Sequence, residues 1–99
     1  MPFDGIDLPP TTKTLLKGRR RIEAGWCQGA FQAGGAVCAV GAVCKDSDDP
    51  ALFTALKVLE TAFGSAVTDI PEWNDSPNRT KDQVLALYDR AIVLSLPDT

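Results

Sequence analysis

The last third of the sequence contains one strongly marked helix, which limits more than any other feature how the chain can fold. Thr80 can cap its first turn, and Gln83 completes a capping box in which each side chain bonds the other residue's backbone N–H. Apolar residues then recur at helical spacing on one face: Val84, Leu87, Tyr88, Ala91 and Ile92. A helix with one apolar face must pack against other elements, so the sequence predicts a helical core.

Composition narrows the class of protein. The chain has 99 residues, of which 44% are hydrophobic and 23% charged, as in a single globular domain. A net charge of −3 excludes a protein that is basic throughout, as many nucleic-acid-binding domains are. No segment reaches the roughly 20 apolar residues of a membrane span, and the start lacks the pattern of a signal peptide. We therefore expect a cytoplasmic protein with no membrane association.

Two more helices are predicted upstream. A threonine at position 11 or 12 can cap a helix that runs to about Ala24 and that Gly25 can end. Residues 48–50, Asp-Asp-Pro, favour a second helix start, because a carboxylate can cap and proline suits the first helical position. Its apolar stripe is Leu52, Leu56, Leu59 and Phe63, with Ala55, Ala62 and Ala66 in the adjacent row and Gly64 at the end.

The middle of the chain is less regular. Residues 26–31 and 36–38 indicate the two strands of a small hairpin, with Gly34 and Gly35 in its turn. The apolar run 36–44 fits a short strand that passes into a buried helix near residues 39–47, although one continuous buried strand would give the same pattern. Residues 68–79 contain two prolines and several turn-forming side chains, which predicts an ordered loop.

Together these patterns predict a mainly α fold with one small β-hairpin. We expect a compact single domain of three principal helices, a short buried helix and the hairpin. Residues 1–11 would form an extended lead-in, residues 12–96 the helical domain, and residues 97–99 a tail.

The residue types argue against most catalytic sites. There is no histidine, so neither a Ser–His nor a Cys–His pair can form. The three cysteines, Cys27, Cys38 and Cys44, lack the C-x-x-C spacing of a zinc knuckle and are expected to be free thiols. We therefore expect no enzyme, no metal and no cofactor. A small cysteine-dependent enzyme or metal protein that uses Cys27 remains an alternative.

Two segments could bind a partner. The aromatic and polar residues before the last helix are the candidate partner-binding set: Trp73, Asn74, Asp75 and Arg79. The structural alternative is that Trp73 fills the edge of the core while Asn74 or Asp75 bonds the turn backbone or pairs with Arg79 or Arg90. The candidate salt-bridge residues are Asp75, Asp89 and Arg90.

The second segment, residues 13–21, is basic and contains no acid. Its candidate anion-binding residues are Lys13, Lys17, Arg19, Arg20 and Arg21. Successive helical residues are turned by about 100°, so the three consecutive arginines cannot share one face and one should be tethered within the fold. Nucleic-acid binding through this helix is an alternative function, although we do not expect a nucleic-acid partner.

An ordered set of short motifs resembles a known family. These are Trp26-Cys27-x-Gly29, Cys38-x-x-Gly41-Ala42, Trp73-Asn74-Asp75, Thr80-x-x-Gln83-Val84-Leu85 and Tyr88-Asp89-Arg90-Ala91-Ile92. Over residues 12–94 the chain resembles small uncharacterised proteins of actinobacteria and of the phages that infect them. The family has no assigned activity, so the resemblance implies a bacterial cytoplasmic setting and no mechanism.

The leading hypothesis is a non-enzymatic interaction protein, with a phage-encoded modulator of a host protein as its specific form. The probable partner is a protein of unknown identity. Homo-oligomerisation is a further expectation, because the apolar run 36–44 would need to be covered.

Overall fold

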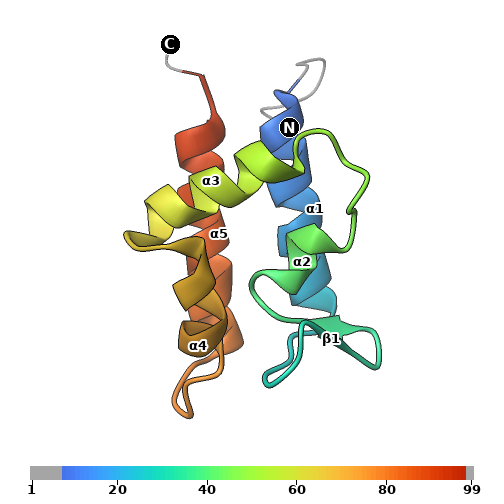
Figure 1. Cartoon of the computed structure of the whole chain (residues 1–99), viewed down its shortest axis with the longest axis vertical. Helices are drawn as coiled ribbons and strands as arrows, with labels where there is room; N and C mark the ends of the chain where they lie inside the picture. Colours follow the sequence, from blue (N-terminus) through green and yellow to red (C-terminus); the bar gives the residue numbers. More distant parts are fainter. Residues whose placement is uncertain (1–7, 98–99) are drawn as a thin grey trace.

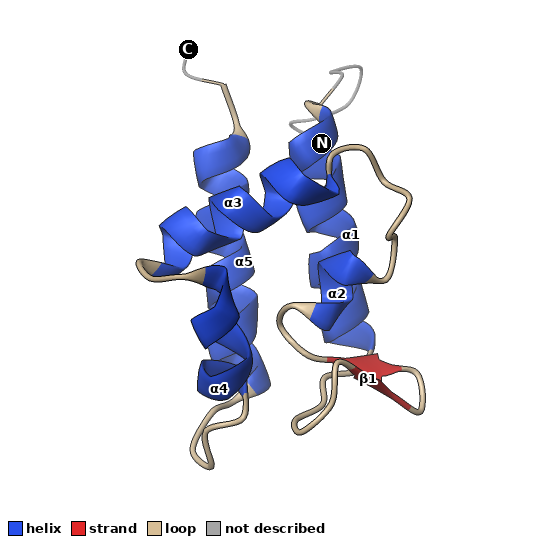
Figure 2. Ribbon diagram, viewed as in Figure 1, coloured by secondary structure: helices blue, strands red, loops and turns tan. Residues whose placement is uncertain are grey.

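The computed structural model describes residues 8–97. Its elements in chain order are α1 (Pro10–Ala24), β1 (Gln32–Ala33), β2 (Ala36–Val37), α2 (Gly41–Cys44), α3 (Leu52–Phe63), the 3-10 helix η1 (Val67–Asp69), α4 (Ile70–Asn74) and α5 (Lys81–Ser95). The predicted mainly α fold with one small hairpin is therefore confirmed (Figure 2).

The two longest helices, α1 and α5, lie side by side and run in opposite directions (Figure 1). α3 crosses both near one end of the molecule, whereas α4 and the hairpin lie toward the other end. Thr12 Oγ1 lies 2.7 Å from Ser95 Oγ, which fastens the first turn of α1 to the last turn of α5. Every α-helix contributes side chains to a single buried core.

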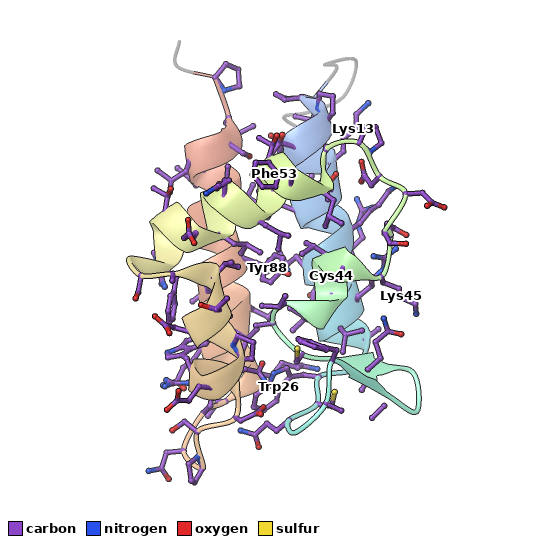
Figure 3. All side chains as sticks on the ribbon, in the orientation of Figure 1. Lys13, Trp26, Cys44, Lys45, Phe53 and Tyr88 are labelled. Carbon is purple, nitrogen blue, oxygen red and sulfur yellow. The ribbon has the colours of Figure 1, made fainter. Side chains whose placement is uncertain are left out.

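Tyr88 lies in the middle of this core and explains the glycine inside α1 (Figure 3). A Cβ on Gly18 would lie 2.8 Å from both the Tyr88 ring and a Val43 methyl group. The Tyr88 hydroxyl donates to the Ala39 carbonyl at 2.6 Å. Gly18 therefore costs about 1 kcal/mol in helix propensity but lets α1 approach α5 and α2 closely.

The ends of the principal helices agree only in part with the predictions. The capping box of Thr80 and Gln83 is present, and Gly64 ends α3 in the left-handed region with φ 90°. α1 begins earlier than expected, at Pro10, because proline suits the first helical position. The predicted threonine caps are wrong, since Thr12 bonds Ser95 instead. Most of the predicted lead-in (residues 1–7) and part of the tail (residues 98–99) lie outside the described residues.

The hairpin is displaced from its predicted position. Its turn does use Gly34 and Gly35, both with positive φ, but its first strand is Gln32–Ala33 and not residues 26–31. Residues 28–31 form bends, because Gly29 has φ 81° and bonds the Asp75 side chain rather than a strand. The small buried helix is confirmed as α2. The chain's own helices bury residues 37–43, so this run does not require a second chain to cover it.

Two further local predictions were wrong. α3 begins at Leu52, and Asp49 acts in the preceding turn by accepting from the Ala51 N–H at 2.9 Å and from the Thr14 hydroxyl at 2.7 Å. The segment predicted as a loop contains η1 and α4, because Pro71 lies in the first turn of α4, where proline is tolerated.

Candidate functional site

Asn74, the last residue of α4, joins three segments of the chain. Its side-chain oxygen accepts from the Trp26 indole N–H at 2.8 Å and from the Ala39 N–H at 2.9 Å. Its amide nitrogen donates to the Cys27 carbonyl and to Asp75 Oδ1, both at 3.0 Å. The side chain is fully buried, and these four bonds use its whole capacity. We call Trp26, Cys27, Ala39 and Asn74 the Asn74 latch.

Asp75 and Gln28 extend the latch to the neighbouring loop. Asp75 Oδ1 accepts from the Gly29 N–H at 2.9 Å, and Gln28 Nε2 donates to the carbonyls of Asn74 and Ser76. The bonds from Gly29 and Asn74 stabilise the carboxylate and lower the pKa of Asp75 below its ordinary 3.8. Of the two roles that the sequence suggested, Asp75 therefore bonds backbone, at Gly29, and it forms no salt bridge with an arginine among the described residues.

Trp73 and Arg79 are packed together beside the latch. The Trp73 ring meets Phe63 edge to face at 5.6 Å, and the Arg79 guanidinium lies 4.2 Å from its centre. Arg79 also donates through Nε to the Trp73 carbonyl at 2.9 Å. Among the four candidate partner-binding residues, Asn74 is buried, Trp73 and Arg79 are half-buried against their own chain, and Asp75 is exposed. The structure brings the four together around the end of α4 and the turn that follows it.

A small hollow of about 240 Å³ lies next to the latch. Its lining residues are Gly29, Ala30, Phe31, Cys38, Pro71 and Asp75.

Burial and the nearby Cys38 and Asp75 raise the pKa of Cys27, so its thiol is protonated at neutral pH. Burial likewise raises the pKa of the Cys44 thiol. These environments do not activate a cysteine nucleophile.

The three cysteines are free thiols and do not assemble a metal site. Within residues 8–97, no group of three or more Cys, Asp or Glu side chains is placed to hold a metal ion. No helix in this part of the chain is long and apolar enough to cross a membrane.

The basic segment of α1 is divided between the fold and the surface. Arg19 pairs with Asp89 at 2.6 Å and with Glu23 at 3.0 Å. Arg21 pairs with Asp46 and donates to the Ala42 carbonyl, both at 2.8 Å. The expectation that an arginine is tethered within the fold is thus confirmed. Lys13, Lys17 and Arg20 are the three candidate anion-binding residues that are exposed.

The predicted salt-bridge set also needs correction. Asp89 does form an ion pair, with Arg19 of α1, whereas Asp75 forms none among the described residues. Arg90 is exposed on α5 and has no ion pair within the described chain.

A second, larger hollow than the one beside the latch lies between α3 and α5. It is open to solvent, measures about 490 Å³ and is lined by Thr61, Ala62, Asp89, Arg90, Val93 and Leu94, which we call the α3–α5 face. Val93 is 69% exposed and Leu94 is 54% exposed. Sequence reasoning missed both, although two apolar residues in the last helical turn, beyond the buried stripe, are a readable signal.

Phe53 is a further exposed apolar residue that the sequence did not single out. It is 71% exposed on α3 (Figure 3), and the Lys57 ammonium lies 5.5 Å from its ring centre. It lies outside the lining of the α3–α5 face.

Comparison with known proteins supports the resemblance seen in the motifs. A family model described as a family of unknown function (DUF6197) matches residues 8–94, which include almost all of the described structure. No curated protein and no solved structure matches the chain. The expectation of an uncharacterised family without an assigned activity is confirmed. The chain therefore belongs to the DUF6197 family of unknown function.

Proposed function

We propose that this chain is a non-enzymatic protein-binding module that docks its partner on the α3–α5 face. The observation that carries the proposal is the pair Val93 and Leu94, two apolar side chains that are more than half exposed beside an open hollow. Exposed apolar surface on a small protein costs solvation free energy that a partner can recover. The bacterial host protein suggested by the motif resemblance is one partner that this proposal allows.

The chemistry of the face favours an amphipathic helix as the docking element. A hollow between two helices accepts the apolar ridge of a third helix. Arg90 borders the hollow without an intramolecular ion pair in the described chain, so an acidic residue beside that ridge would find a partner. The raised pKa of Cys27 and the lack of histidine support a binding role rather than catalysis.

Site-specific photo-crosslinking in bacterial cells tests this proposal. A photoreactive amino acid in place of Leu94 should give one discrete protein adduct. The same replacement at Lys45, which is exposed next to α2, is the matched control and should give none. If position 94 gives no adduct, or gives the same products as position 45, the proposed docking face is wrong.

A further inference from the structure

The outward side of α5 is exposed along several turns. Asp82, Ala86, Asp89, Arg90 and Val93 recur at steps of one to four residues and are all solvent-exposed. Residues three and four apart on a helix lie on the same side, so these side chains form one continuous strip. From residue 86 to residue 93 the strip has an acid and a base side by side at its centre and an apolar residue on each side of them.

This order is self-complementary when a second copy is placed against it in the opposite direction. A two-fold axis through the midpoint between Asp89 and Arg90 brings each acid opposite the other copy's base. The same axis brings Ala86 opposite Val93, because these residues lie equally far from the midpoint on either side. We propose that the partner docked on the α3–α5 face is a second copy of this chain, with the two α5 helices antiparallel. This inference rests on the proposed function and identifies its partner.

The charges select this arrangement over a parallel one. In a parallel two-fold pair each residue meets its own copy, so Arg90 would face Arg90 and like charges would repel. In the antiparallel pair Arg90 gains the ion pair that it lacks within the described chain. Asp89 already bonds Arg19, but its side chain is 57% exposed and can accept from a second cation.

The apolar parts of the face complete the interface. Leu94, Thr61 and Ala62 flank the strip and would border the partner helix. Closed two-fold dimers are the commonest assemblies of identical chains. One helix face with this border is small beside standard interfaces of about 800 Å² per partner, so we expect a weak dimer in the micromolar range.

Sedimentation velocity between low micromolar and millimolar concentrations tests the pairing. The wild-type chain should pass from monomer to dimer. Val93→Asp and Arg90→Glu should each weaken the dimer on the order of a hundredfold, because they place a charge against an apolar residue or an acid against an acid. Lys45→Glu, a charge reversal on another surface, should sediment like the wild type.

Mixing two charge-reversed variants tests the register. Arg90→Glu and Asp89→Arg should each be monomeric alone, whereas an equal mixture should form a heterodimer, because both central pairs are then acid against base. Asp89→Arg loses its bond to Arg19, so its helical circular dichroism is checked first. If it does not fold, Val93→Asp decides, since a dimer that survives this change would overturn the proposal.

The two proposals fail in different ways. A wild-type chain that stays monomeric at millimolar concentration, or a folded mixture that does not pair, overturns the self-association. If position 94 then crosslinks to a different protein, the docking face itself stands. An adduct with twice the chain mass supports both proposals.

Discussion

The Asn74 latch and the α3–α5 face use their side chains in opposite ways. In the latch, every polar group of Asn74 is bonded inside the chain. In the α3–α5 face, Val93 and Leu94 are apolar yet exposed. The comparison teaches that conspicuous polar and aromatic residues can be bonded within the fold, whereas inconspicuous aliphatic residues can be the exposed ones, and the docking proposal rests on these.

Among the tests of this comparison, the largest loss of stability is expected from a substitution in the latch. Asn74→Ala leaves the Trp26 indole N–H, the Ala39 N–H and the Cys27 carbonyl without their partner. Unsatisfied buried groups of this kind should lower the free energy of unfolding by roughly 3–5 kcal/mol, measured by urea denaturation. Asn78→Ala, an exposed asparagine in the next turn, is the control and should change it by less than about 0.5 kcal/mol. Equal losses would show that the latch is not specific.

A smaller loss is expected from Gly18→Ala. The added methyl group would meet Tyr88 and Val43 at 2.8 Å, and overpacking of this kind costs about 1–3 kcal/mol against about 1 kcal/mol gained in helix propensity. Val43→Ala removes one obstacle, so the double variant should lose less stability than the two single variants together. Additive losses in denaturation experiments would indicate that the close approach at Gly18 is not the cause.

The sequence predicted the helices well where the signal was local. The capping box at Thr80 and the stop at Gly64 depend on backbone groups a few residues away, so pattern and structure agree. The first strand of the hairpin was misplaced because residues 28–31 are held by Asn74, Asp75 and Ser76, which are distant in sequence. Such tertiary bonds leave no periodic pattern.

The candidate sites show the same limit. The sequence predicted that one of the three consecutive arginines is tethered but not which, because Asp89 and Asp46, the partners of Arg19 and Arg21, lie on other elements. Trp73 and Arg79 looked available in the sequence, yet a helical turn at α4 packs them together. Val93 and Leu94 were overlooked because their residue type does not mark a binding site; the readable signal was their position beyond the buried stripe of the helix.

Acid should weaken the latch in a way that one substitution can reveal. The folded pKa of Asp75 is lowered, so its contribution to stability is complete above its ordinary pKa of 3.8 and is lost as the pH falls through the folded value. The Tm should therefore fall as the pH is lowered from 5 toward 2, and Asp75→Asn, whose amide oxygen can still accept from Gly29, should reduce that fall. The fall in Tm that remains in Asp75→Asn is expected from Asp49, whose pKa is lowered by its hydrogen bonds from Thr14 and Ala51. An unchanged acid profile in Asp75→Asn would contradict this account.

The smallest change in stability is expected from a substitution in the α3–α5 face. This small change would distinguish the face from the Asn74 latch, where a substitution should be strongly destabilising. Val93→Ser replaces a side chain that is 69% exposed, so at monomeric concentrations the free energy of unfolding should change by less than about 0.5 kcal/mol. Val84→Ser on the same helix, where the side chain is fully buried, should cost about 2–4 kcal/mol. If Val93→Ser lowers the free energy of unfolding by more than about 1 kcal/mol, Val93 stabilises the monomer itself. Its apolar side chain would then need no partner to explain it.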